Sequence, residues 1–183
     1  MRVMTWMSML EYRAWQSEDL YELVPRLKPA DVRGIQAAVG VDPRMAIEKS
    51  VTNSKRVWAI IIAGQVEGII GIGPYPKAAG VGIPWLLSSP IIEKHPRLLL
   101  SEGRRWLKHF HRHYHTLTNT VDSRNVQAIR WLNHIGFTVA RVIPGYGIAK
   151  IPFTQLVSYK EGNASNRTSK QYGHVSNNVY NSG

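Results

Sequence analysis

Apolar and polar residues recur with two different periods along this chain, and the change of period divides it into segments. Residues 10–24 predict a short strand that turns into a helix, with Ser17 as the N-cap. A second helix is predicted from Pro29 to Gly40, since apolar residues recur at helical spacing between a typical first residue and a typical stop. A third is predicted to begin at Asp42, which caps it. The first third of the chain is therefore expected to be mainly helical.

The pattern then changes to continuous apolar runs of strand length. VWAIIIAG (57–64) and VEGIIGIG (66–73) predict two buried strands, joined by a tight turn at Gly64-Gln65 into a hairpin. A loop follows, and residues 81–89 predict a third strand that ends before a proline.

The second half of the chain alternates helices and strands. Residues 96–114 predict an amphipathic helix, and Gly103 in its middle is expected to allow close packing on the sheet. Residues 116–122 are rich in β-branched side chains and predict a strand. Another amphipathic helix follows, and two closing strands are predicted to turn at Pro144-Gly145. This order predicts an α+β fold, with a mixed, mostly antiparallel twisted sheet flanked by helices and one parallel strand-helix-strand unit.

Composition separates the end of the chain from the rest. The chain has 183 residues and 44% apolar residues, which suits one domain with a real core. From residue 158 onward Ser, Asn and Gly dominate, and such a segment cannot bury enough apolar surface to fold alone. We therefore expect a domain at residues 1–157 and an extended, polar, basic tail at 158–183 that is ordered by a partner protein.

Several classes of protein are excluded by what the sequence lacks. There is no cysteine, which excludes disulfides, thiolate zinc sites and a cysteine nucleophile. The apolar runs are about strand length, whereas a spanning helix needs roughly 20 residues, so no membrane span is expected. Glu11 stands early and no small-residue cleavage site follows, so no secretory signal is expected. These features fit a protein made in a cytoplasm.

The net charge of +11 is concentrated in the second half of the chain. Residues 94–183 contain 13 Lys and Arg but only 3 Asp and Glu, which indicates contact with a polyanion or an acidic protein surface. Spaced tyrosines in the tail add groups that stack on bases or dock into a protein. The expected partner or nucleic-acid surface consists of Arg104, Arg105, Lys108, Arg112, Tyr159, Arg167, Lys170, Tyr172 and Tyr180.

Histidines stand at alternate positions in the segment HFHRHYH. On a helix, His109 and His113 share one face, at the spacing of a zinc-binding pair. No third ligand is evident and cysteine is absent, so no metal site is predicted. The histidines are instead expected to belong to a basic helix face whose charge rises below about pH 6.5.

The segment VDSRNVQAIRWLNHIGF carries the most specific pattern, V-x3-N-x2-A-I-x6-G-F. The residues that match it are Val121, Asn125, Ala128, Ile129, Gly136 and Phe137. Asn125 is expected to cap the helix, and Gly136 to end it in a left-handed conformation. The pattern resembles the end of the GNAT (Gcn5-related) N-acetyltransferase fold, and the order of elements agrees from about Leu10 to Leu156.

The resemblance implies a cofactor site that can be checked against the sequence. Members of the family place a glycine-rich Q/R-x-x-G-x-G/A loop after the central strand, to hold the CoA diphosphate on backbone N–H groups. Here no glycine occurs between Gly82 and Gly103, two prolines remove donors, and Glu93 adds a negative charge. If acetyl-CoA binds at all, the resemblance places it in a groove formed by Leu87, Ser88, Ser89, Lys94 and Asn125.

The family's general acid can be checked in the same way. Many members carry a tyrosine four residues before the glycine of Gly-Phe, and here that position is Leu132, which has no proton to donate. Neither Tyr114 nor Tyr146 is placed in the groove by the sequence, and Glu67 is the one weak candidate for a base. We therefore expect no enzymatic activity, no catalytic residue and no cofactor.

Three stretches, VPRLKPADVRGIQAAVG, IPWLLSS and NTVDSRNVQAIRWLNHIGF, resemble small GNAT-like proteins of short-tailed bacteriophages. This resemblance implies a non-catalytic structural protein of the virion, internal or associated with the core, portal or tail, and made in the host cytoplasm. Its expected partners are other virion proteins in a multi-copy assembly. Two alternatives stay open: an acyl-CoA-dependent N-acetyltransferase with an atypical phosphate site, and a nucleic-acid-binding module.

Overall fold

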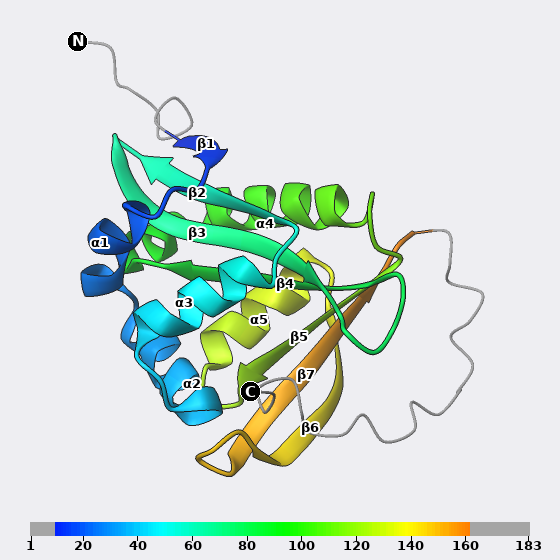
Figure 1. Cartoon of the computed structure of the whole chain (residues 1–183). Coiled ribbons are helices and arrows are strands. Elements are labelled where there is room, and N and C mark those ends of the chain that lie inside the picture. The colour runs from blue at the N-terminus through cyan, green and yellow to red at the C-terminus, as the bar shows by residue number, and fades with distance from the viewer. Residues whose placement is uncertain (1–9, 162–183) are drawn as a thin grey trace.

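The computed structural model describes residues 10–161 as one mixed sheet with helices on both faces (Figure 1). The seven strands lie in the order β1-β2-β3-β4-β5-β7-β6. The strands are β1 (Leu10–Ala14), β2 (Arg56–Ile62), β3 (Gln65–Pro74), β4 (Val81–Ser88), β5 (Thr116–Asp122), β6 (Thr138–Tyr146) and β7 (Ile151–Tyr159). The helices are α1 (Asp19–Leu23), η2 (Val24–Arg26), α2 (Pro29–Val39), α3 (Pro43–Thr52), η3 (Pro90–Lys94), α4 (Pro96–Phe110) and α5 (Val126–Ile135). The predicted α+β class with a mostly antiparallel sheet is confirmed.

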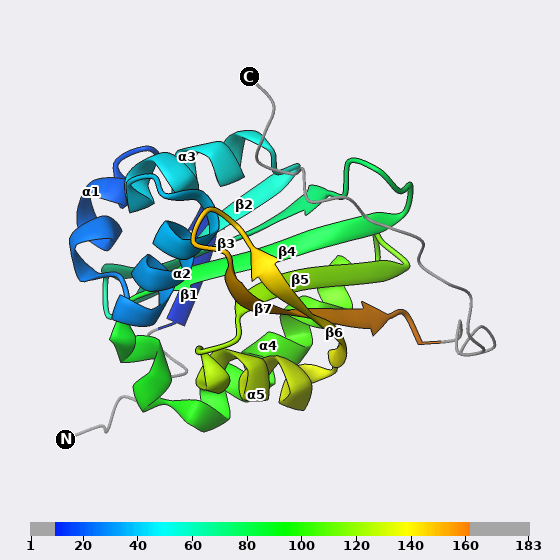
Figure 2. The same cartoon turned by 90° about the horizontal axis from the view of Figure 1, so that it is seen from below.

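Two helical layers enclose the sheet (Figure 2). Helices α1, α2 and α3 cover one face, where Leu23, Ile47 and Ile69 form the centre of a fully buried cluster. Helices α4 and α5 cover the other face, where Leu117 and Leu156 are buried beneath them. Strand β3 is buried on both faces, which explains why its sequence is a continuous apolar run rather than an alternating one.

The β2–β3 hairpin turns one residue earlier than predicted. Ile62 pairs with Gln65, so the two turn residues are Ala63 and Gly64, not Gly64 and Gln65. Both have positive φ, 53° and 80°, as a two-residue hairpin of the right-handed twist requires. The glycine was a correct signal for the turn, but it occupies the second turn position.

The closing hairpin turns later than predicted. Strand β6 continues through Pro144 and Gly145 to Tyr146, with a register shift after Ile143, and the turn follows it. Proline has no backbone N–H to donate, but Pro144 is tolerated because β6 is the edge strand of the sheet. A bulge accommodates the residue. The predicted turn is therefore an irregularity within the strand.

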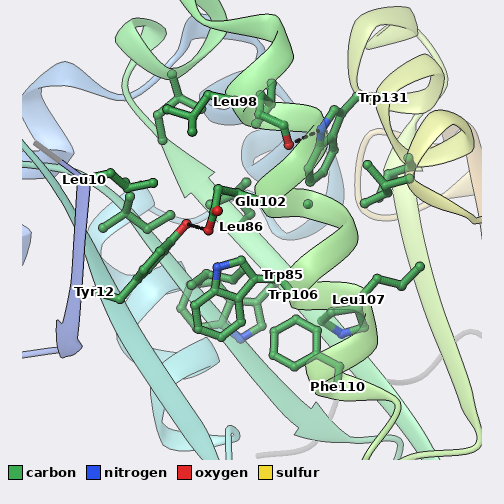
Figure 3. Close-up of a pocket in the computed structure, with 18 of the residues that line it drawn as sticks. Leu10, Tyr12, Trp85, Leu86, Leu98, Glu102, Trp106, Leu107, Phe110 and Trp131 are labelled. Carbon is green, nitrogen blue, oxygen red and sulfur yellow. Dashed lines mark hydrogen bonds between the residues drawn. The ribbon is translucent and has the colours of Figure 1, made fainter. Parts of the chain in front are cut away.

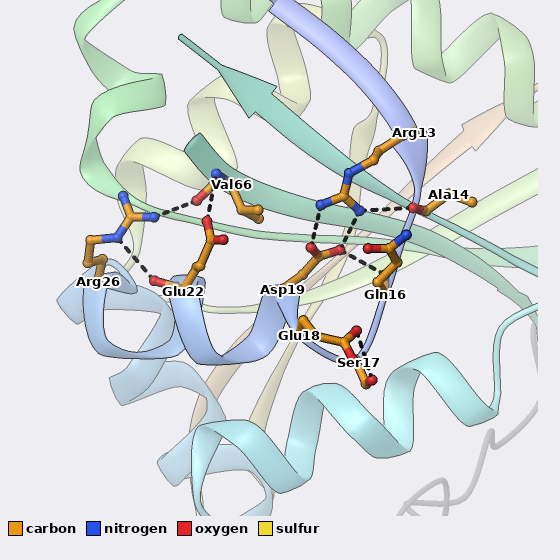
Figure 4. A network of polar contacts seen from close by, with 9 residues as sticks. All are labelled: Arg13, Ala14, Gln16, Ser17, Glu18, Asp19, Glu22, Arg26 and Val66. Carbon is orange, nitrogen blue, oxygen red and sulfur yellow. Dashed lines mark hydrogen bonds and ion pairs between the residues drawn. The ribbon is translucent and has the colours of Figure 1, made fainter. Parts of the chain in front are cut away.

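Helix α1 begins without the predicted cap. Ser17 Oγ bonds the neighbouring Glu18, and no side chain caps the first turn. The buried carboxylate of Asp19 instead accepts the Gln16 N–H at 2.8 Å and pairs with Arg13 (Figure 4). The tie from Asp19 to Arg13 of β1 fixes α1 against the sheet, which is a longer-range role than a local cap.

Helix α4 differs from its prediction at two points. It ends at Phe110, and a turn of three residues leads to Tyr114, which is nevertheless buried at 7% exposure. Gly103 packs on α5 and not on the sheet: an added Cβ would lie 2.9 Å from both Ile135 Cγ2 and Trp131 Cζ2. The glycine therefore sets the distance between the two helices.

Strand β7 extends to Tyr159, so the first two residues of the predicted tail belong to the sheet. Ser158 is buried, and its hydroxyl lies 3.0 Å from His111 Nε2. The rest of the predicted tail, from residue 162, lies outside the described residues. None of the helices between residues 10 and 161 is long and apolar enough to cross a membrane.

Candidate functional site

The two central parallel strands separate soon after they begin. β4 and β5 pair only at Val81 with Thr116 and at Gly82 with Leu117. Beyond these pairs the strands diverge, and the side chain of Asn119 spans the gap by donating from Nδ2 to the Pro84 carbonyl at 3.0 Å. The proline contributes to the separation because it has no N–H to offer β5.

The backbone of β4 presents polar groups to this gap. Along a strand, the N–H and C=O of successive residues point to opposite sides. The Pro84 carbonyl points toward β5, and so do the Ser88 N–H, which donates to Asp31 at 3.3 Å, and the Ser88 carbonyl, which accepts the Lys28 N–H at 3.0 Å. Leu86 lies two residues from both Pro84 and Ser88, so its N–H and C=O point to the same side as theirs. They face the gap, where β5 supplies no ladder partner.

A cleft of about 540 Å³ passes through the sheet at this gap. On one face it is lined by α2, α3 and the β6–β7 hairpin, including Ile35, Val39 and Phe153. On the other face it is lined by α5 and α4, including Ala128 and Trp131. The cleft therefore offers one continuous path through the sheet, in which a slender molecule from one face can meet a second molecule from the other.

A smaller apolar pocket of about 80 Å³ lies between α4 and strands β1 to β4 (Figure 3). At its rim the Tyr12 hydroxyl donates to Glu102 at 2.8 Å, and burial raises the pKa of Tyr12 well above its usual value. Trp131 and Leu99 line both spaces, and Trp131 Nε1 donates to the Leu99 carbonyl at 3.3 Å. The pocket is almost wholly apolar, so the polar and charged groups that could take part in a reaction are those of the larger cleft.

The carboxylates in the cleft differ in their proton affinity. The side chain of Asp31 is only 10% exposed, and burial is the main cause that raises its pKa, with Lys28 opposing the shift. Asp122 is also buried, but its hydrogen bonds to Arg124 hold its pKa below the usual range. Asp31 therefore binds a proton more readily than Asp122 does, and no feature of the sequence distinguished it.

The chain after β4 contains no glycine-rich loop. Ser89 caps η3 by accepting the Ile91 N–H at 3.2 Å, and its hydroxyl donates to Glu67. Helix α4 then begins at Pro96 with no side chain capping its first turn. The N-terminal N–H groups of α4 are therefore open to an anion, with the cations Lys94 and Arg97 beside them.

Three of the five predicted groove residues line the cleft: Leu87, Ser88 and Asn125. Ser88 Oγ is buried and has no hydrogen-bond partner within residues 10–161. Asn125 also accepts the Ala128 N–H at 3.2 Å, which confirms its predicted role as a cap. Ser89 and Lys94 do not line the cleft, since Ser89 turns inward to a buried carboxylate and Lys94 lies exposed at the end of η3.

The position at which many GNAT proteins carry the acidic tyrosine is occupied by a leucine with apolar surroundings. Leu132 is 5% exposed and contributes to the floor of the cleft. Of the two tyrosines considered, Tyr146 lines the cleft, whereas Tyr114 is buried with its ring against Gly82. Glu67 is not a base of this cleft, because it is buried in an ion pair that lies outside it.

The predicted partner surface is only partly described. Three of its residues are exposed along α4, a fourth is exposed in the turn that follows the helix, and its first tyrosine is 45% exposed at the end of β7. These described members are Arg104, Arg105, Lys108, Arg112 and Tyr159. The other members, Arg167, Lys170, Tyr172 and Tyr180, lie outside the described residues. Within residues 10–161 no group of three His, Asp or Glu side chains is placed to hold a metal ion.

Several cleft residues had no part in the sequence prediction. Pro84 and Asn119 are unusual within central strands, and together they signal a place where a ladder is interrupted. Leu86 gave no signal, because the groups that matter are its backbone N–H and C=O.

The tip of the β6–β7 hairpin forms a roof that is fastened to α2. Ile148 N–H and Ala149 N–H donate to the carbonyls of Ala38 and Ala37 at 3.2 and 3.1 Å. We expect Gly147→Ala to break this contact, because φ is +65° and the new Cβ would lie 2.5 Å from the Ala37 carbonyl oxygen. The loss is expected to be about 1–3 kcal/mol of stability, with faster amide exchange at the two donors.

Gly145→Ala is the matched control in the same hairpin, since nothing lies within 4 Å of its added Cβ. Urea unfolding and hydrogen exchange compare the two variants. Equal stability and equal protection at residues 148 and 149 would show that the roof does not depend on the close approach at Gly147.

No family model and no curated protein matches this chain. Solved structures do match it over most of their length. AAC(6')-Ib in complex with ribostamycin and coenzyme A is 13% identical over 88% of this chain and 99% of that chain, with a TM-score of 0.63. A GCN5-related N-acetyltransferase from Kribbella flavida is 14% identical over 84% and 99%, with a TM-score of 0.62. YncA from Salmonella typhimurium, with its cofactor acetyl-CoA, is 15% identical over 88% and 99%, with a TM-score of 0.59.

At these identities the likeness shows the fold, and the predicted GNAT fold is confirmed. The expectation of a non-catalytic phage structural protein is wrong, because the structures that share this fold with the chain are acetyltransferases. Nothing in them connects the chain with a virion, so the expected virion partners have no support either.

Proposed function

We propose that this protein is an acyl-CoA-dependent N-acyltransferase that moves an acetyl group from acetyl-CoA to an amine. The observation that carries the proposal is the cleft through the sheet, which contains the N–H and C=O of Leu86 without a ladder partner on β5. The fold is shared with structures that contain coenzyme A or acetyl-CoA, which supports the same use of the cleft here.

The donor arm has complementary groups on the protein. Backbone N–H and C=O groups at a strand edge pair with an extended amide-bearing chain as they would with another strand. Leu86 supplies such a pair, and the partnerless Ser88 hydroxyl supplies a further hydrogen bond at the end of β4. Acetyl-CoA, when bound, supplies an activated thioester carbonyl in the middle of the sheet.

The diphosphate end is held in an atypical way. The uncapped N-terminus of α4 offers N–H groups and a positive helix end, and Lys94 and Arg97 add charge. Glu93 opposes an anion, but it pairs with Lys28 at 3.1 Å, which offsets part of its charge. Because the glycine-rich cradle is missing, we expect weaker binding of the donor than a full cradle would give.

Asp31 is the proposed base. The amine nitrogen forms the new bond to the acyl carbon, the electron pair of the carbon–sulfur bond leaves with sulfur, and the amine proton passes to Asp31 directly or through water. A raised pKa suits this role, because a base that operates near neutral pH must hold a proton there. A protein acid is not essential, since thiols ionise with a pKa of roughly 8.5 and the thiolate is a stable leaving group.

The test is the release of CoA thiol from acetyl-CoA in the presence of amines, with the acetylated product identified by mass spectrometry. We expect release that depends on the amine. Asp31→Asn is expected to lower kcat/KM by about 10²-fold, with little change in the Kd of acetyl-CoA. If no amine of a broad panel is acetylated although acetyl-CoA binds, the proposed transfer is wrong.

A further inference from the structure

The face of the cleft under α2 and α3 has apolar walls and a cationic rim. Its walls include Ile35, Val39 and Ile143. The cations come from three separate elements: Lys49 of α3, Arg141 of β6 and Lys150 of the β6–β7 turn. A second substrate that enters from this face therefore meets an apolar surface surrounded by positive charge.

Arg141 is aimed at the cleft by a chain of hydrogen bonds. Its Nε donates to Gln155 Oε1 at 2.8 Å, and Gln155 Nε2 donates to Thr118 Oγ1 at 3.3 Å. All three side chains line the cleft. No carboxylate within residues 10–161 pairs with Arg141, so one edge of its guanidinium is fixed by a neutral amide while its charge is not compensated.

Lys150 stands in a conformation that lysine seldom adopts. Its φ is 52°, in the left-handed region that residues with a Cβ rarely adopt. The turn that holds it is fastened to α2 by the Ile148 and Ala149 N–H groups. Lys150 too has no carboxylate partner in the described part of the chain, so the fold places a second uncompensated cation at the cleft.

Each carboxylate of the cleft has a neighbouring cation, but Asp31 and Glu93 share the same one. Asp31 and Glu93 both pair with Lys28, at 3.7 and 3.1 Å, and Asp122 pairs with Arg124 at 2.6 Å. Four Lys and Arg side chains and three carboxylates line the cleft, so its net charge is positive, and low-dielectric walls strengthen the resulting potential. Such a potential repels a polycation and attracts a substrate that carries a negative charge.

We propose that the acceptor is an amine that carries its own carboxylate, namely an α-amino acid with an apolar side chain. This assignment rests on the proposed acyl transfer and names its acceptor. The guanidinium of Arg141 suits a carboxylate because its planar fork donates two parallel hydrogen bonds, and Lys150 adds a point charge. The apolar walls receive the side chain, and the amine is left free to attack the thioester.

The experiment uses the full chain, saturating acetyl-CoA and three probes: L-phenylalanine, L-phenylalaninamide and spermidine. The amide keeps the amine and the ring but lacks the carboxylate, and spermidine is a polycation. We expect kcat/KM for L-phenylalanine to exceed that for either other probe by about tenfold or more. This is the effect expected of one hydrogen bond to a charged group. An amide or a polyamine used as well as the amino acid would overturn the assignment.

Two variants test the residues directly. Arg141→Gln and Lys150→Gln are each expected to raise the KM for L-phenylalanine about 5- to 10-fold, with the Kd of acetyl-CoA unchanged. Lys108→Gln, on the exposed face of α4 and outside the cleft, is the matched control and should change neither constant. Unchanged KM in both variants overturns the assignment. If the wild type binds acetyl-CoA but these tests fail, only the assignment of the acceptor is wrong. If the wild type does not bind acetyl-CoA, the proposed function is wrong as well.

Discussion

Leu86→Pro is expected to weaken the binding of acetyl-CoA by about 10- to 100-fold, because the substitution removes the backbone N–H that faces the cleft. Proline lacks this donor, and the acceptor on the ligand is then left unpaired. The ladder between β4 and β3 should survive, since the lost N–H points away from β3, as the N position of Pro84 already does. Calorimetric titration with acetyl-CoA measures the effect.

The control for this variant is Leu86→Ala. Leu86 packs against the core under α4, so both substitutions lose its side chain and both are expected to lower stability by about 2–3 kcal/mol. Only the proline variant loses the N–H. If the two variants bind acetyl-CoA equally, while circular dichroism shows both folded, then the backbone of β4 is not what holds the donor.

Arg26→Ala is expected to lower the free energy of unfolding by about 3 kcal/mol, because it leaves Glu67 charged and buried without its partner. Arg26 Nη1 lies 2.9 Å from Glu67 Oε1. Arg26 Nη2 also donates to the Val66 carbonyl at 2.7 Å, and Figure 4 shows this second contact. The side chain of Glu67 is 7% exposed. This pair fastens η2 to the first residues of β3, next to the segment that follows β4.

The double variant Arg26→Met/Glu67→Leu separates the charge from the packing. Replacing both members of a buried ion pair by apolar residues of similar size is usually close to neutral, so most of the lost stability should return. Urea unfolding measures all three proteins. If the single variant costs less than the double variant, the carboxylate is not the cause of the instability.

The sequence was sufficient for the elements that local chemistry defines. Asn125 caps α5 and Gly136 ends it with φ of 122°, both as predicted, because caps depend on residues within one turn. Gly40 ends α2 and Asp42 caps α3 for the same reason. The order of helices and strands along the chain also followed, since the period of the apolar pattern distinguishes the two.

The cleft could not be predicted in the same way. The length over which two parallel strands stay paired depends on contacts with residues far away in the sequence. The periodicity of apolar residues carries no information about such contacts. Asp31 reaches the Ser88 N–H across 57 residues of sequence, and Asn119 reaches the Pro84 carbonyl across 35. Such contacts bring together residues that each resemble ordinary helix or strand residues when taken alone.

The expectation of a phage structural protein was wrong for a related reason. A glycine-rich loop and a tyrosine are side-chain signals, and both are absent, as the structure confirms at η3 and Leu132. The groups that we propose for donor binding are backbone N–H and C=O groups at a strand edge and a helix terminus. Sequence patterns seldom reveal such groups, because almost any side chain is compatible with them.

The most direct test of this account is a calorimetric titration of the full chain with acetyl-CoA. We expect saturable binding of one acetyl-CoA per chain with a Kd in the micromolar range, which corresponds to about −8 kcal/mol, and displacement by free CoA. Absence of saturable binding up to about 1 mM, where the free energy would be weaker than roughly −4 kcal/mol, would contradict the assignment of the cleft as a donor site.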